Sequence, residues 1–319
     1  MWDHSRLREW LVAETLPLWL EKGCDLRDGG FHEKLDFDLT PITNEGKRIM
    51  VQARQCYVFA VFAGELPEAS SAATSGFDFM LSHGAHPEGG WRHRVARDGA
   101  PQDDSRDLYD QAFALFAAAW MHAAFGREDA LSAARATLEY LDTQRAHPSG
   151  GYSENILAGG GLAEGPRRQN PHMHLFEAVL ALFDATGDDA YLARAEVLFD
   201  LARTKFIVDG TLREYFTDGL DPVQGTMGTI VEPGHHMEWV WLLHRYAALT
   251  DERRAIETAA QLYAFALDHG YDAGSGGLLD EVTFTGAVHQ DSRRLWPQTE
   301  ALKGHLARRE RGDDRAAAA

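Results

Sequence analysis

The chain has 319 residues, 45% of them hydrophobic, and its 31 basic and 49 acidic residues give a formal net charge of −18. This charge argues against nucleic acid or an anionic membrane surface as the main partner and favours a neutral small molecule. With only Cys24 and Cys56 and no apolar run near ~18 residues, we expect a cytoplasmic protein without a disulfide framework or a membrane span.

Helical patterns follow one another in pairs along the chain. The expected helices cover residues 5–22, 46–63, 68–83, 105–125, 128–145, 171–186, 188–206, 233–249, 252–269 and 293–309. Between the pairs, a diglycine followed by an aromatic or apolar residue recurs about every sixty residues. It occurs at Gly29-Gly30-Phe31, Gly89-Gly90-Trp91, Gly150-Gly151-Tyr152 and Gly276-Gly277-Leu278, with Asp209-Gly210-Thr211-Leu212 in the intervening place. Each period is therefore a helix hairpin and a loop with a short extended piece.

The expected helices are of two kinds. Residues 188–206 carry apolar side chains on one side and charged ones on the other, as in a surface helix. Residues 172–185 and 235–248 are apolar nearly all round, so they must be covered on both sides. Asn170 is the expected N-cap of the first of these inner helices, with Pro171 at its first helical position, and Pro233-Gly234 marks the start of the second.

Outer and inner helices that alternate at a fixed repeat close into two concentric rings. The pattern thus predicts an all-α fold, an (α/α)6 toroid of helix hairpins, with residues 1–319 as one domain. A six-hairpin ring needs a further glycine loop and helix after Ala319, so we expect the last hairpin to be incomplete in this sequence.

Two inner helices carry titratable groups in their first turns. His174 and Glu177 are three residues apart, as are His235 and Glu238, so each pair shares a helix face. A glutamate one turn on can hold one ring nitrogen and leave the other free for proton transfer. A hydrogen-bonded core histidine is the alternative for each pair taken alone.

Further candidates lie on other inner helices. Arg54 interrupts an apolar pattern, and a buried guanidinium needs either a core carboxylate or substrate oxygens as partners. Tyr109, Trp296 and Glu300 lie near the starts of later inner helices. The aromatic residues suit either core packing or a pit that contacts the apolar face of a sugar ring.

A metal site is a rival explanation of His172-Met173-His174 and of residues 235–238. Neighbouring helix residues point in different directions, so only one imidazole per helix can face the pit, and no HExxH motif occurs. The sequence also lacks a GxxxxGK phosphate loop and a GxGxxG after a strand. We therefore expect no metal and no cofactor.

Five runs of the sequence resemble the N-acylglucosamine 2-epimerase superfamily, in particular its bacterial D-mannose isomerase branch. They are GGFHEKLD, VQARQCYVFA, QNPHMHLFEA, EPGHHMEWVWLL and RLWPQTEALK, and the likeness extends in order from about residue 5 to residue 305. The resemblance implies an (α/α)6 barrel that interconverts aldose and ketose, or epimerises at C2, by metal-independent proton transfer.

Carried over by position, the resemblance implies that His235 is a catalytic acid/base with Glu238 beside it, and we add His174 as a second catalytic candidate. The implied substrate pocket contains Arg54, Tyr109, His174, Glu177, Trp296 and Glu300. The family places another catalytic histidine on a final inner helix after the sixth glycine loop. His305 lies on the preceding inner helix and does not match it.

We predict an isomerase that interconverts D-mannose and D-fructose, or a close sugar, through a cis-enediol. A sugar 2-epimerase would need a proton delivered to the opposite face. An inverting glycosidase would use two carboxylates about 6.5–9.5 Å apart, with Glu177, Glu238 and Glu300 as candidates. A sugar-binding protein without activity is the third alternative. The expected partner is a monosaccharide, and the expected state is a monomer or homodimer.

Overall fold

The structure is a computed structural model that describes residues 4–312. Contacts divide the chain into two compact units, and each is described by itself. Unit 1 comprises Met1–His147, Tyr152–Glu164 and Glu177–Leu192, and unit 2 comprises Pro148–Gly151, Gly165–Phe176 and Ala193–Ala319. The single domain expected over residues 1–319 stays a prediction.

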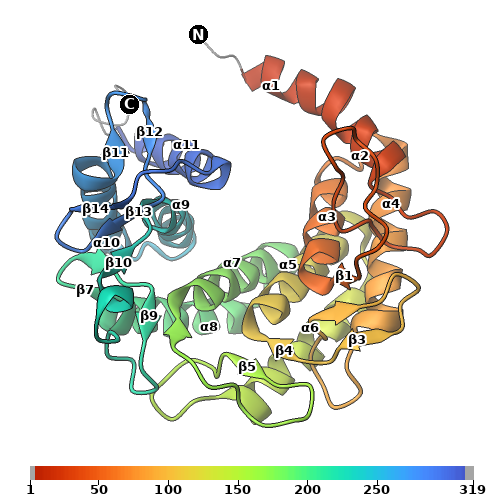
Figure 1. The fold of residues 1–319 in the computed structure, drawn as a ribbon, viewed down its shortest axis with the longest axis horizontal. Helices are drawn as coiled ribbons and strands as arrows, with labels where there is room; N and C mark the ends of the chain where they lie inside the picture. The colour runs from red at the N-terminus through yellow and green to blue at the C-terminus, as the bar shows by residue number, and fades with distance from the viewer. Residues whose placement is uncertain (1–3, 313–319) are drawn as a thin grey trace. The chain divides into compact units, whose positions relative to one another are not determined.

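Helices make up most of the described chain (Figure 1). The α-helices are α1 (His4–Trp10), α2 (Leu16–Lys22), α3 (Ile49–Val61), α4 (Pro67–Phe79), α5 (Leu108–Phe125), α6 (Glu128–Tyr140), α7 (Gln169–Thr186), α8 (Asp189–Leu201), α9 (Pro233–Thr250), α10 (Arg253–Phe265) and α11 (Leu295–Glu310). Wider π-helical turns are η1 (Leu11–Thr15), η2 (Met80–Gly84), η3 (Leu141–Arg145), η4 (Ala202–Phe206) and η6 (Ala266–Gly270), and η5 (Thr226–Thr229) is a 3₁₀ turn. The order of helices predicted from the sequence is confirmed.

Short antiparallel strands connect the hairpins. They are β1 (Lys47–Arg48), β2 (Arg94–Val95), β3 (Pro101–Asp103), β4 (Arg106–Asp107), β5 (Asn155–Ile156), β6 (Arg167–Arg168), β7 (Ile207–Val208), β8 (Thr211–Leu212), β9 (Tyr215–Phe216), β10 (Ile230–Val231), β11 (Tyr271–Asp272), β12 (Gly277–Leu278), β13 (Glu281–Thr283) and β14 (Val288–Gln290). In unit 1, β1–β2–β3 form one sheet and β4 pairs with β5. In unit 2, the pairs are β6–β9, β7–β8 and β11–β12, and β10–β13–β14 form a sheet.

The inner and outer roles expected for the helices are seen within each unit. In unit 1, α3 packs against α4 and α5, and in unit 2, α9 packs against α10 and α11 (Figure 1). Helix α9 is buried over most of its length, whereas α10 buries one face only. An apolar helix covered on both sides therefore alternates with an amphipathic one, as the two patterns predicted.

One structural device repeats after the diglycines. The backbone N–H of Phe31 donates to Oε1 of Gln52 at 2.7 Å, and Nε2 of Gln52 donates to the carbonyl of Phe31 at 2.9 Å. Gln111 makes the same two bonds to Trp91, and Gln298 makes them to Leu278. We call this arrangement the glutamine clamp. It satisfies backbone groups of the loop and fixes the loop against the inner helix.

The clamp explains the second glycine of the motif. Gly30 and Gly90 have φ of 65° and 74°, which a residue with a Cβ rarely adopts. An added Cβ would also lie 2.6 Å from Oε1 of Gln52 or 2.7 Å from Oε1 of Gln111. Each of these glycines is therefore required both by its backbone conformation and by the close approach of the clamp.

The expected start of the third inner helix needs a correction. Asn170 was predicted as the helix cap, but α7 already begins at Gln169. The backbone N–H of Gln169 bonds to the carbonyl of Glu214, next to the β6–β9 pairing, and α7 begins directly after strand β6. The second predicted start is confirmed, because α9 begins at Pro233.

Candidate active site

The candidate site in unit 2 is built where a loop meets the start of an inner helix. Strands β6 and β9 pair Arg167 with Phe216 and Arg168 with Tyr215. This pairing brings Glu214, in the link between β8 and β9, beside the first residues of α7. The side chain of Glu214 is 3% exposed, and such a buried carboxylate needs hydrogen-bond donors.

His235 supplies one of those donors from the first turn of α9. Its Nδ1 lies 3.0 Å from Oε2 of Glu214, and the residue is 5% exposed. Burial by itself disfavours the charged imidazole, but the carboxylates of Glu214, Glu232 and Glu238 together raise the pKa of His235 to about 9. Burial also opposes ionisation of Glu214, yet the charge and hydrogen bond of His235 hold the pKa of that carboxyl below its ordinary value. The couple is therefore an imidazolium and a carboxylate at neutral pH.

Its neighbour His236 has a different environment. Nε2 of His236 accepts the backbone N–H of Leu212 at 3.2 Å, and Nδ1 lies 3.3 Å from the carbonyl of Glu232. An acceptor Nε2 and a donor Nδ1 define a neutral imidazole. Burial lowers the pKa of His236 to about 4. His236 thus replaces the glutamine of the clamp, and of the two adjacent histidines only His235 is held in its charged form.

The same comparison places His172 among the clamp residues. Nδ1 of His172 lies 3.1 Å from the carbonyl of Arg168, four residues earlier, as Nδ1 of His236 lies against the carbonyl of Glu232. A Cβ on Gly151 would lie 2.5 Å from Nε2 of His172. His172 therefore contacts the glycine loop as Gln52 and Gln111 do.

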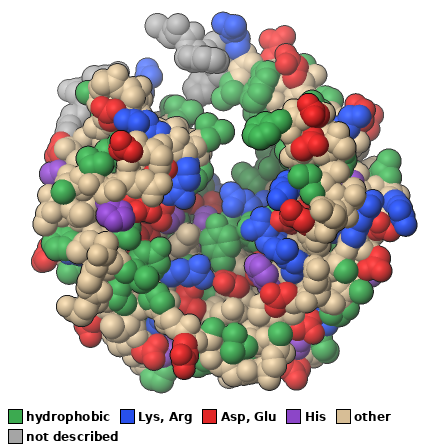
Figure 2. Space-filling model, in the orientation of Figure 1, with side chains coloured by type: hydrophobic (Ala, Val, Ile, Leu, Met, Phe, Trp, Pro, Cys, Tyr) green, Lys and Arg blue, Asp and Glu red, His purple; other side chains and the backbone are tan. Residues whose placement is uncertain are grey.

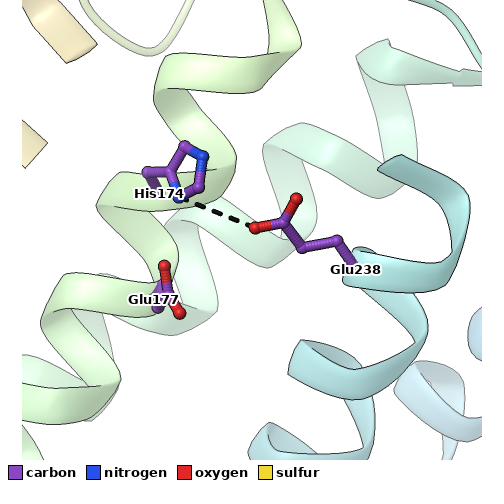
Figure 3. A group of neighbouring side chains, drawn as sticks. All are labelled: His174, Glu177 and Glu238. Carbon is purple, nitrogen blue, oxygen red and sulfur yellow. Dashed lines mark ion pairs between the residues drawn. The ribbon is translucent and has the colours of Figure 1, made fainter. Parts of the chain in front are cut away.

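His174 points toward α9. Its Nδ1 lies 3.7 Å from Oε1 of Glu238, and the side chains are 9% and 8% exposed (Figure 3). Glu177 follows His174 by one turn of α7 (Figure 3), and it belongs to unit 1. Glu238 therefore lies between two imidazoles, since it pairs with His174 and contributes to the charged state of His235.

The pairing predicted inside α9 needs correction. Glu238 was expected to hold a ring nitrogen of His235, but Glu214 holds it instead. The two His-Glu pairs are also not equivalent: the clamp residues His172 and His236 correspond, so His174 corresponds to Glu238. The His-x-x-Glu spacing recurs with a shift of three residues, which a search by spacing alone cannot detect.

Trp296 belongs to the same neighbourhood. Its ring centroid lies 4.9 Å from that of His235. A Cβ on Gly234 would lie 2.7 Å from the Trp296 ring, so this glycine lets α11 approach the start of α9. Glu300, one turn on, forms an ion pair with Lys303 at 2.7 Å, and Nζ of Lys303 lies 4.4 Å from the centroid of Trp241. The structure thus places Trp296 against His235 and pairs Glu300 with Lys303.

Arg54 and Tyr109, like Glu177, belong to unit 1. The guanidinium of Arg54 is 4.7 Å from the centroid of Phe113, whose ring is 4.9 Å from that of Tyr109. Arg54 was expected to be buried, but it is exposed, with its guanidinium over the ring of Phe113. Lys and Arg side chains gather near β1 and α3 (Figure 2). Substrate binding by Arg54 and Tyr109 stays a prediction.

Unit 2 contains groups with the chemistry of metal ligands. Ligand atoms of Glu214, Glu232 and His235 lie within 4.8 Å of one another. These atoms already have partners: Gln169 donates to Glu214 at 3.0 Å, and Arg294 donates to Glu232 at 3.0 Å. A cation would have to displace these donors and the proton on His235.

Sequence reasoning missed Glu214, although a signal was present. In every repeat, the second residue after the aromatic or apolar position is titratable: Glu33, His93, Glu154, Glu214 and Asp280. Several of these side chains contact the start of the next inner helix: Glu33 bonds to Arg48, His93 to Asp110, Glu214 to His235 and Asp280 to Arg294. Alignment of the loops would have found this position.

Comparison with known proteins decides the family. The sequence profile for N-acylglucosamine 2-epimerase (GlcNAc 2-epimerase) matches residues 29–319. The chain belongs to this family. The mannose-6-phosphate isomerase of Rhizobium meliloti (strain 1021) is 35% identical over 310 residues, which cover 95% of this chain and 79% of the relative. The cellobiose 2-epimerase of Dictyoglomus turgidum is 26% identical over 322 residues, which cover 95% of this chain and 80% of the relative.

Fold and enzyme class follow from these comparisons. A crystal structure of D-mannose isomerase superposes with a TM-score of 0.89 at 22% identity, over 98% of this chain and 82% of that one. The predicted α/α toroid class is therefore confirmed. The protein is a sugar isomerase or epimerase of the N-acylglucosamine 2-epimerase family. In the part of the chain that the structure describes, no helix is long and apolar enough to span a membrane.

Proposed function

We propose that this N-acylglucosamine 2-epimerase family member is an aldose-ketose isomerase that interconverts D-mannose and D-fructose, or a close sugar. The observation that carries the proposal is a buried imidazolium, His235, one helix turn from a carboxylate that pairs with a second imidazole, His174. Isomerisation needs one group that moves a proton between C2 and C1 and one that exchanges a proton with O1 and O2. In this proposal, His174 beside Glu238 is the first group and His235 beside Glu214 is the second.

The proposed reaction starts from the open-chain aldose. His174 removes the proton from C2, and His235 donates a proton to O1, which gives a cis-enediol. His174 then returns its proton to C1, and O2 gives its proton to His235 as the C2 carbonyl forms. Both histidines end as they began. Glu238 orients His174, and Glu214 stabilises the charge on His235 while O1 is still a carbonyl.

We rank isomerisation above 2-epimerisation because a single group, His174, can handle the carbon-bound proton in an isomerase. In an isomerase, one group can move the proton between adjacent carbons on a single face of the enediol. A 2-epimerase must return a proton to the opposite face of C2, which needs a second proton-donating side chain on that side. Formation of D-glucose from D-mannose in the same assay would assign the 2-epimerase reaction instead.

The test is the conversion of D-mannose to D-fructose by the wild-type protein and by His235→Asn. Loss of a positioned acid/base lowers kcat by ~10²–10⁴-fold. His236→Gln is the matched control, because glutamine occupies the same clamp position in other repeats, and we expect it to keep wild-type activity. Full activity of His235→Asn would exclude the proposed role of this histidine.

A further inference from the structure

A chain of buried hydrogen bonds ends at His235. Nε1 of Trp239 donates to Oε1 of Gln169 at 2.8 Å, and Nε2 of Gln169 donates to Oε2 of Glu214 at 3.0 Å. The same carboxylate oxygen accepts from Nδ1 of His235 at 3.0 Å. Gln169 is 0% and Trp239 is 1% exposed, so bulk water does not compete for these bonds.

Each member of the chain fixes the next one. The indole N–H can only donate, so Oε1 of Gln169 must face Trp239 and the amide nitrogen must face Glu214. The donor from Gln169 then holds Glu214 as an acceptor in the direction of His235. Trp239 is itself fixed by stacking on Phe176, with ring centroids 5.4 Å apart.

We propose that Trp239, Gln169 and Glu214 are positioning residues that hold His235 in one orientation and in its protonated form. This inference rests on the proposed function for its catalytic consequence, but the protonation of His235 can be measured without any sugar. With Nδ1 committed to Glu214, Nε2 is the nitrogen left to exchange a proton with substrate oxygens.

Other charged groups near His235 must be separated from this effect. The carboxylates of Glu232 and Glu238 also stabilise its charge, whereas the neighbouring His236 disfavours it only when protonated. Glu232 is in turn paired with Arg294 and lies in the field of Glu281, and the Trp296 ring covers one side of His235. Glu232 gives the matched control, because its carboxylate lies near His235 while the hydrogen bond between the two residues joins backbone groups.

The experiment follows the Cε1–Hε1 resonance of His235 by NMR, with histidine-labelled protein and assignment by His235→Asn. In Glu214→Gln, we expect the midpoint of His235 to fall by about 1–3 pH units, as for loss of an opposite charge within hydrogen-bond distance. Glu232→Gln should shift the midpoint by less than half as much. Equal shifts in the two variants, or no shift in folded Glu214→Gln, would overturn the inference.

Trp239→Phe tests the hydrogen-bond chain at the end far from His235, and it is the test to use if Glu214→Gln does not fold. The phenyl ring keeps contact with Phe176 but cannot fix the Gln169 amide, so the His235 midpoint should fall, by less than in Glu214→Gln. An unchanged midpoint would contradict the chain. If the midpoints move as expected while His235→Asn keeps full isomerase activity, the positioning role stands and the proposed function fails.

Discussion

The two units contain the same couple with its members exchanged. In unit 2, the loop carries the carboxylate, Glu214, and the helix carries the imidazole, His235. In unit 1, the loop carries the imidazole, His93, and α5 carries the carboxylate, Asp110, with Nδ1 to Oδ2 at 2.8 Å. The positions are equivalent, because each helix member directly precedes a clamp residue, Gln111 or His236.

The two couples differ in the burial of the loop member. The side chain of His93 is 32% exposed, whereas that of Asp110 is 3% exposed. Burial raises the pKa of Asp110 to about 6, and the hydrogen bond that the imidazole donates to this carboxylate raises the pKa of His93. The helix member is buried in both units, but in unit 2 the loop member is buried too, since the side chains of His235 and Glu214 are 7% and 3% exposed. The fold therefore provides the contact in both units, and in unit 2 it encloses both the imidazolium and the carboxylate.

The largest expected difference between the couples is in catalysis. His235→Asn should lose ~10²–10⁴-fold in kcat, because its imidazole exchanges protons with the sugar oxygens. His93→Asn removes the imidazole of the other couple and should keep kcat within about tenfold. Steady-state mannose isomerisation measures both. A larger loss in His93→Asn than in His235→Asn would reverse the assignment of the two couples.

His174 gives a second test of the catalytic half of this comparison. His174→Asn should lower kcat by about 10²-fold or more, since the carbon-bound proton would have no acceptor. Thermal unfolding should change little, because Asn keeps a polar group near Glu238. Retained kcat with a raised KM would instead make His174 a binding residue.

The clamps allow a comparison of stability. Gln111 is fully buried and bonds both backbone groups of Trp91, whereas Gln298 is half-buried. Gln111→Ala leaves buried groups without partners and should lower the free energy of unfolding by about 2–4 kcal/mol, against about 1 kcal/mol for Gln298→Ala. Urea denaturation of both variants checks the order. Equal losses would show that burial does not set the strength of the clamp.

The neutral imidazole of His236 has a smaller effect, which is on the pH dependence of the free energy of unfolding. Because burial lowers the pKa of His236 to about 4, the stability it contributes is present above its ordinary value of 6.5 and is lost as the pH falls toward 4. His236→Gln does not titrate, so between pH 7.5 and pH 5 it should lose about 2 kcal/mol less than the wild type. Parallel urea curves at the two pH values make the measurement. Identical pH dependence would contradict the neutral state.

The sequence predicted the helices and the family but not the contacts that charge His235. Helix spacing and diglycines are local signals, so the alternation of inner and outer helices could be read directly. Glu214 meets His235 only because β6 pairs with β9, across residues far apart in the chain. Periodicity does not report such pairing. The repeated His-x-x-Glu spacing also suggested an equivalence that the clamp residues show to be shifted by three positions.

Solvent hydrogen exchange tests the central claim most directly. With D-mannose in D₂O, the proton on His174 exchanges with solvent in part of the turnovers before it is returned to C1. The account therefore predicts D-fructose that carries deuterium at a single C1 position in part of the product, and a reaction ~10²–10⁴-fold slower with His235→Asn. A reaction in which hydrogen moves from C2 to C1 with no deuterium uptake, at the same rate in His235→Asn, would contradict it.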